Sequence, residues 1–128
     1  MNQIQRLYMV PVLIIIILLP VFLVRAQDPA KVAKDVYKTT TDNEHVRVLD
    51  IRLKPGGKSP MHSHPAYIAI ALTPCKVKFT APNGKSQEVE LKPGEAVWRD
   101  AETHSVDNVG GECHALNIEL KRATKKGN

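Results

Sequence analysis

Histidines at two places in the chain have the types and spacing of metal ligands. His62 and His64 stand two residues apart, and His104 follows forty residues after His64. Side chains two residues apart on a β-strand point to the same face, so both imidazoles of the first pair can reach one ion. Three neutral imidazoles at ~2.0–2.1 Å make an open metal site with exchangeable positions. The spacing therefore predicts a divalent metal site of His62, His64 and His104.

The elements that must position these histidines are short strands. Between residues 44 and 120, alternating apolar runs follow one another, and Gly or Pro closes most of them. Asn83-Gly84 stands between two such runs, which is a hairpin signal. Strands at 8–12-residue spacing with turn signals between them are typical of a sandwich or barrel. With 128 residues, the chain has room for one domain. We therefore expect a single all-β domain.

The first 26 residues read as an export signal. Arg6 precedes an uncharged apolar run of 18 residues (7–24), and small residues stand at −3 and −1 of a cut after Ala26. These are the parts of a secretory signal peptide, which would direct the protein to the periplasm or the extracellular space. The alternative is an uncleaved membrane anchor, since 18 apolar residues can just span ~30 Å of hydrocarbon.

The rest of the chain divides into three parts. Residues 27–43 are polar and are interpreted as a leader, 44–120 as the barrel, and 121–128 as a basic flexible tail. The net charge of +5 resides at the ends, because residues 27–120 hold 12 basic and 13 acidic side chains. A near-neutral barrel gives no reason to expect nucleic acid as a partner. We expect no contact with the membrane once the signal is cleaved.

Cys75 and Cys113 are the two cysteines of the chain. Disulfides persist outside the cytoplasm, so an exported protein could keep a disulfide between these two cysteines. The spacing does not say whether their Cα atoms come within ~7 Å. A disulfide and two free buried thiols both stay open at this point.

The segment around the first histidine pair resembles the first motif of the cupin superfamily, which comprises small β-barrels with a metal pocket. That motif asks for Gly, five residues, His-x-His and then Glu. Gly56, His62 and His64 fit in register. Ile68 or Ala69 stands where the motif has its glutamate, so the resemblance implies a site that has lost its carboxylate ligand.

The segment around His104 resembles the second cupin motif. Gly94, His104 and Asn108 fit that motif, whereas Asp100 and Glu102 replace its Pro and Gly. Six of the ten signature positions match, across residues 44–120. The resemblance implies a single-domain cupin β-barrel, also called a double-stranded β-helix or jelly roll. It also implies a homodimer, since barrels of this family often pair.

By the same resemblance, His62, His64 and His104 would hold the ion without a carboxylate. The ion would then keep its full 2+ charge, attract anionic molecules such as enolates or thiolates, and lower the pKa of a bound water. Some cupins with three-histidine iron sites are dioxygenases of thiols or diketones. Fe(II) is therefore the favoured ion, with Zn, Mn or Ni as alternatives.

Four further residues are candidates for the pocket. Glu102 is interpreted as a fourth ligand or proton carrier with a catalytic role, the alternative being an exposed loop residue. Met61, Tyr67 and Trp98 flank the motifs and are predicted to line the cavity, although ordinary packing would also account for them.

These observations lead to one functional hypothesis and two competing ones. The chain is interpreted as an exported metal-binding cupin that binds or transforms a small, anionic molecule. Dioxygenase chemistry at Fe(II) is its most concrete enzymatic form, and a metal-dependent isomerase is another. The competing hypotheses are a non-catalytic module that binds a small molecule, and a metal-free structural barrel.

Overall fold

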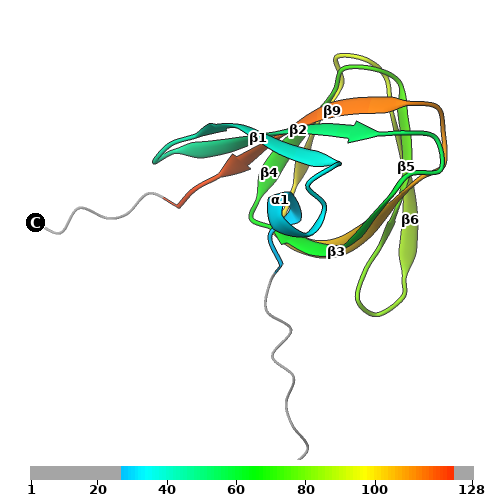
Figure 1. Cartoon of the computed structure of the whole chain (residues 1–128), viewed down its shortest axis with the longest axis horizontal. Helices are drawn as coiled ribbons and strands as arrows, with labels where there is room; N and C mark the ends of the chain where they lie inside the picture. Colours follow the sequence, from blue (N-terminus) through cyan, green and yellow to red (C-terminus); the bar gives the residue numbers. More distant parts are fainter. Residues whose placement is uncertain (1–26, 123–128) are drawn as a thin grey trace, which may run out of the picture.

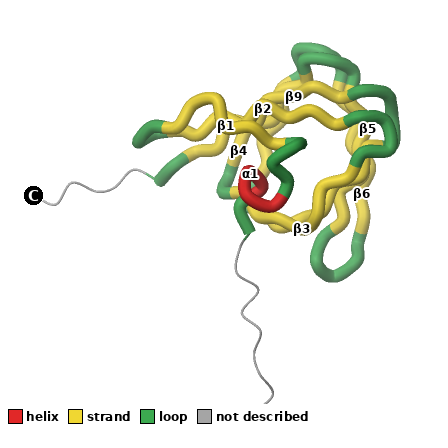
Figure 2. Tube along the Cα trace, in the orientation of Figure 1, coloured by secondary structure: helices red, strands yellow, loops and turns green. Residues whose placement is uncertain are grey.

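The computed structural model describes residues 27–122, which contain nine β-strands and one short helix (Figures 1 and 2). The predicted signal segment and residues 123–128 of the predicted tail lie outside this range. Within it, no helix combines the length and the hydropathy that crossing a membrane requires. In chain order the elements are α1 (Pro29–Val32), β1 (Tyr37–Asp42), β2 (Val46–Leu53), β3 (Lys58–His64), β4 (Tyr67–Ala71), β5 (Cys75–Thr80), β6 (Ser86–Leu91), β7 (Ala96–Arg99), β8 (Glu102–Asn108) and β9 (Cys113–Leu120).

The strands form two antiparallel sheets that together enclose a barrel (Figure 1). One sheet has the order β1-β2-β9-β4-β7, and the other has the order β3-β8-β5-β6. Neighbours in space are mostly distant in the chain, as in a jelly roll rather than an up-and-down meander. The predicted all-β barrel is confirmed.

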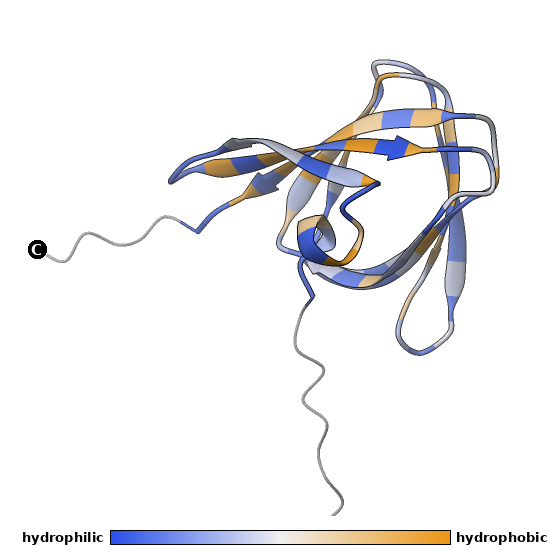
Figure 3. Cartoon of the chain, viewed as in Figure 1, coloured by the Kyte–Doolittle hydropathy of each residue, from blue (hydrophilic) through white to orange (hydrophobic). Residues whose placement is uncertain are grey.

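Along each strand, side chains alternate between the inside of the barrel and its outer surface, which produces the alternating colours of Figure 3. In β2, Leu49, Ile51 and Leu53 are buried, and they pack with Val77 of β5 and Val106 of β8 in one apolar core. The core therefore bridges the two sheets and holds the barrel closed.

Three residues that match the cupin motifs shape turns between strands of the barrel. Gly56 and Gly94 have φ of 71° and 85°, a backbone conformation that side chains with a Cβ rarely adopt. Asn108 is buried, and its Nδ2 donates to the carbonyl oxygens of Leu53 and Gly111 at 3.0 and 2.8 Å. These contacts tie the end of β8 to the turn after β2.

The predicted boundary between the leader (27–43) and the barrel (44–120) is wrong. Residues 37–42 form β1, which pairs with β2 at the edge of the five-stranded sheet, and Tyr37 is only 3% exposed. The five residues of β1 after Tyr37 are all exposed. An edge strand with one buried residue shows no apolar alternation, so its sequence looks like a polar linker.

Cys75 and Cys113 are joined by a disulfide, with their Cα atoms 4.8 Å apart. Cys75 begins β5 and Cys113 begins β9, so the bond links the two sheets. Both cysteines are buried in the core. Of the two states that the sequence left open, the structure contains the disulfide.

Replacing both cysteines by serine should destabilise the fold. The two cysteines are separated by 38 positions, and closing a loop of that length removes chain entropy that corresponds to about 4 kcal/mol. We expect the free energy of unfolding, measured by denaturant titration, to fall by about that amount in Cys75→Ser/Cys113→Ser. Reduced wild-type protein serves as the control. Equal stability of the oxidised, reduced and doubly substituted proteins would show that the bond does not hold the sheets together.

Candidate metal centre

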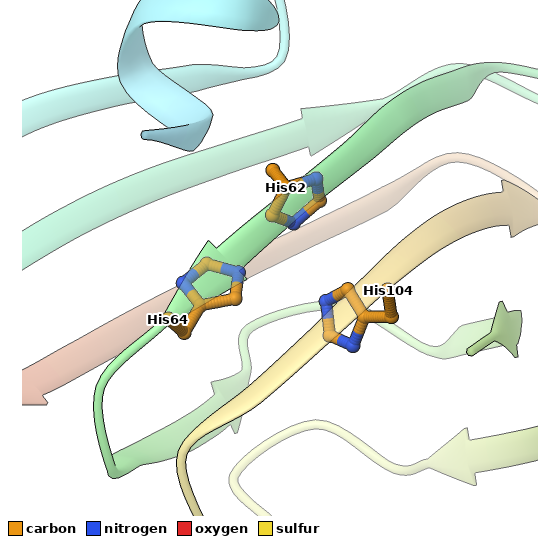
Figure 4. Close-up of side chains that lie close together, drawn as sticks. All are labelled: His62, His64 and His104. Carbon is orange, nitrogen blue, oxygen red and sulfur yellow. The ribbon is translucent and has the colours of Figure 1, made fainter. Parts of the chain in front are cut away.

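The three predicted histidines come together on two neighbouring strands. His62 and His64 lie on β3, His104 lies on β8, and the antiparallel register places His62 opposite His104. All three residues are at most 4% exposed. One nitrogen from each ring can be chosen so that the three atoms lie within 4.8 Å of one another. Figure 4 shows the rings facing one another across the space between the strands.

Two of these histidines are oriented through their Nδ1 atoms. Nδ1 of His62 lies 2.7 Å from the carbonyl oxygen of Pro60, and Nδ1 of His64 lies 2.7 Å from Oε1 of Glu119. A carbonyl and a carboxylate only accept hydrogen bonds, so both Nδ1 atoms carry the proton. In the neutral form of each ring the lone pair is therefore on Nε2, as in histidines that bind metals through Nε2.

The Nε2 atom of His64 is the observation that best fits a metal. It is buried, and no atom of the described residues forms a hydrogen bond with it. Buried polar atoms normally have a partner, and one without a partner requires an explanation. Nε2 of His62 has a partner, the hydroxyl of Tyr37 at 3.2 Å. Nδ1 of His104 lies 3.4 Å from Oε2 of Glu102 and makes no hydrogen bond within residues 27–122.

Burial keeps the imidazoles in the form that binds metals. Loss of solvent lowers the pKa of His62 to about 4, and the neighbouring His64 and His104 add to that effect. Burial likewise lowers the pKa of His104, although the carboxylate of Glu102 opposes the shift. His62 and His104 are thus neutral at neutral pH, and neutral imidazole is the species that coordinates a metal ion.

Glu119 on β9 is the functional residue that sequence reasoning missed. It is 2% exposed, and its Oε2 accepts a hydrogen bond of 2.7 Å from Nε of Arg47. Arg47 also donates from Nη1 to Oδ2 of Asp28 at 2.8 Å. Burial alone would raise the pKa of Glu119, but the hydrogen bonds from His64 and Arg47 hold it below its usual value. The ion pairs Asp28–Arg47 and Arg47–Glu119 therefore hold the Glu119 carboxylate in place against Nδ1 of His64.

Glu102, predicted as a fourth ligand or proton carrier, lies beside His104 and is held by Tyr67 and Arg99. Its Oε1 accepts from the hydroxyl of Tyr67 at 2.6 Å, and Arg99 donates to both carboxylate oxygens at 2.8 and 2.7 Å. Burial opposes ionisation, yet the nearby His104 ring and the hydrogen bonds from Arg99 and Tyr67 hold the pKa of Glu102 far below its usual value. A carboxylate that stays ionised over the whole neutral range is a poor general acid.

The position of the missing motif glutamate faces the barrel interior. Ala69 on β4 lines the internal cavity, whereas its neighbour Ile68 is not among the lining residues. A methyl group thus stands where the motif has a carboxylate. Glu119 does not replace that ligand, because its two oxygens are held by His64 and Arg47.

An internal cavity of about 70 Å³ lies beside the histidines. His104, Tyr37 and Tyr67 form part of its wall, and apolar side chains of both sheets form most of the rest. A second hollow of about 200 Å³ shares Phe79, Arg99 and His104 with the first and extends toward the β5–β6 hairpin. The Phe79 ring stacks on that of His104, with centroids 4.6 Å apart.

Of the three residues predicted to line the pocket, only Tyr67 does so. Trp98 is 55% exposed, and its Nε1 donates to Asp100 at 2.9 Å. Its neighbours Val97 and Arg99 line the cavity instead, because they have the opposite parity on β7. Met61 alternates with His62 and lines neither hollow. The predictions for Trp98 and Met61 are therefore wrong, since adjacent residues of a strand point to opposite faces.

Comparison with known proteins finds likeness at the level of structure. No family model and no curated protein matches the sequence. A cupin domain from Bordetella pertussis Tohama I is 29% identical, over 68% of this chain and 93% of that chain, with a TM-score of 0.63. A cupin superfamily protein from Desulfitobacterium hafniense is 15% identical, over 68% and 77%, with a TM-score of 0.53.

A third neighbour has the same architecture. It is an RmlC-like cupin family protein with a double-stranded β-helix fold from Methanocaldococcus jannaschii, 16% identical over 67% of this chain and 79% of that chain, with a TM-score of 0.53. The two facing antiparallel sheets and the cupin domains that resemble them lead to one conclusion. The described part of the chain has the jelly-roll β-barrel fold of the cupins.

Proposed function

We propose that this protein is a metal-binding member of the cupin superfamily that binds or transforms a small molecule inside its barrel. The observation that carries the proposal is the buried Nε2 of His64, which has a fixed lone pair and no hydrogen-bond partner in the described residues. His62 and His104 stand next to it in the neutral form.

The donor set fits a divalent transition metal. Imidazole nitrogen suits Zn, Cu, Fe and Ni, whereas Mg and Ca prefer oxygen ligands. Fe(II) is our favoured ion because of the resemblance to three-histidine iron cupins, and Zn, Mn and Ni are alternatives. When bound, such an ion would supply Lewis acidity, or with Fe(II) the activation of oxygen in a dioxygenase-like reaction.

The chain's own residues would do three things for that chemistry. Glu119 accepts from Nδ1 of His64, which would leave Nε2 of that ring to hold the ion. Glu102, held by Arg99 and Tyr67, faces Nδ1 of His104. The surrounding barrel keeps bulk water away, and exclusion of water strengthens the electrostatic interactions in the site.

A metal-free barrel is the second candidate function, and one contact favours it. The hydroxyl of Tyr37 bonds Nε2 of His62, which satisfies that nitrogen without an ion. For His62 to bind a metal, Tyr37 must give up this bond. A metal-free barrel, including one that only holds a small molecule, would leave the Tyr37–His62 hydrogen bond intact.

Export is a further part of the proposal. The disulfide between Cys75 and Cys113 supports it, because structural disulfides persist in oxidising compartments and are rare in the cytoplasm. We propose that the protein acts outside the cytoplasm, in the periplasm or the extracellular space.

Protein produced from the full-length chain should bind one divalent ion per chain with its three histidines. At an ion concentration of 100 times Kd, binding adds about 2.7 kcal/mol to the free energy of unfolding. We expect equilibrium dialysis with Zn(II), Co(II) and Fe(II) to give a stoichiometry near one, and thermal unfolding to shift upward. His104→Ala should lose both effects. His45→Ala is the matched control, because that side chain is 80% exposed. Binding that survives His104→Ala would contradict the proposal.

Removing the charge of Glu119 should weaken metal binding through His64. Such supporting contacts are typically worth 10–100-fold in metal affinity. We expect Glu119→Gln to raise the Kd for Zn(II) at least tenfold, whereas Glu90→Gln, on an exposed position of β6, leaves it unchanged. Thermal unfolding of both metal-free variants shows whether the fold is intact. An unchanged Kd in a folded Glu119→Gln protein would mean that Glu119 is only a structural ion-pair partner.

A further inference from the structure

The internal cavity beside the histidines differs from what an anion-binding pocket requires. Most of its lining consists of aliphatic and aromatic side chains from both sheets. The polar exceptions are few and have defined positions: Tyr37, Tyr67, Arg99, His104 and Asn117. The chemistry of these five decides what the cavity can hold.

Arg99 is the one cationic side chain among the lining residues, and its charge is already matched. Its Nε and Nη2 atoms donate to Oε1 and Oε2 of Glu102 at 2.8 and 2.7 Å. Tyr67 also donates to Glu102, at 2.6 Å. The lining therefore offers no free cation for an anionic group of the ligand. A charged group that is buried without a partner is strongly disfavoured.

A ligand in this cavity can nevertheless reach an ion at the histidines. His104 belongs both to the histidine cluster and to the wall of the cavity. The methyl group of Ala69, which stands at the position of the motif glutamate, also lines the cavity. One face of the ion would thus be open to the cavity, and the ion would be the only positive charge there without a counterion among the described residues.

The volume of the cavity limits the size of the ligand. The cavity of about 70 Å³ has room for more than a single water molecule but not for a large ligand. A short chain or a single small ring fills this space. Each methylene group transferred from water into an apolar cavity improves binding roughly fourfold.

We propose that the ligand of this site is a small amphiphile: a single anionic or acceptor group that binds the ion, on a short apolar chain or a single small ring that fills the cavity. This inference rests on the proposed metal site and narrows the ligand class. It excludes diacids and other molecules with two charged ends from this cavity, because the residues that line it give a second charge no partner.

The test uses Co(II)-loaded full-length protein, whose visible spectrum reports ligands at the ion. The probes are acetate, propanoate, butanoate and pentanoate, together with succinate, which has the carbon number of butanoate and a second carboxylate. We expect affinity to rise roughly fourfold per added methylene up to the capacity of the cavity. Butanoate should bind at least tenfold more tightly than succinate.

Two variants separate filling of the cavity from binding at the ion. Ala69→Leu adds bulk inside the cavity, and should abolish the gain from longer chains while Co(II) stays bound. Ala96→Leu, on the exposed side of β7, is the control and should behave as wild type. The Co(II) content and thermal unfolding of each variant, measured first, show that the metal site and the fold are intact.

The outcomes distinguish this inference from the proposed function. If Co(II) binds and succinate is preferred, or if the chain-length series is flat, the inference is overturned while the metal site stands. If Co(II) binds but no monocarboxylate changes its spectrum, the cavity is packing space and the inference is again overturned. If Co(II) does not bind, the metal proposal falls and the inference with it.

Discussion

The carboxylate of Glu119 lies buried between Arg47 and His64, and the arrangement of the site depends on these two contacts. Taking a charge out of water costs several kcal/mol unless partners surround it. Here, one oxygen faces a guanidinium and the other an imidazole N–H. Because Arg47 is on β2, Glu119 on β9 and His64 on β3, the interaction connects the two sheets at the histidine cluster. Losing Arg47 would leave the Glu119 carboxylate buried without a cationic partner, and breaking a buried ion pair in this way typically costs about 3–5 kcal/mol.

The same constraint explains which residues face inward. On β9 the inward parity carries small and polar residues, including Asn117 and Glu119, whereas Leu116 and Ile118 point outward. In an ordinary sandwich, the larger apolar residues of a strand would be expected in the core. A barrel that holds a polar site in its interior inverts that pattern locally. The apolar side chains of Val48, Ile118, Ile68 and Trp98 consequently align across the outer face of β2, β9, β4 and β7.

Much of the fold and the central histidine cluster could be predicted from the sequence, because both depend on local spacing. The His-x-His pair places two imidazoles on one face wherever a strand forms, and the motif around His104 indicated its partner. The other features of the site depend on how distant strands pair and meet in the folded barrel. Glu119 reaches His64 only because β9 and β3 meet across the barrel, and nothing near residue 119 indicates that contact. β1 escaped prediction for a related reason, since its one buried residue, Tyr37, has no periodic neighbours. Whether Trp98 and Met61 line the cavity depends on which face of their strand points inward. Their closeness to the motifs in the sequence does not determine that face.

The central claim is that the three histidines form one coordination site. X-ray absorption spectroscopy of the Zn(II)-loaded protein tests it most directly, because imidazole ligands produce a characteristic multiple-scattering pattern. The account predicts three imidazole nitrogens at ~2.0–2.1 Å, with the remaining shell made of light atoms from water or ligand. A shell with one imidazole or none, or one dominated by oxygen ligands, would contradict it. In that case the ion would be bound elsewhere, and the histidine cluster would be part of the barrel's interior packing.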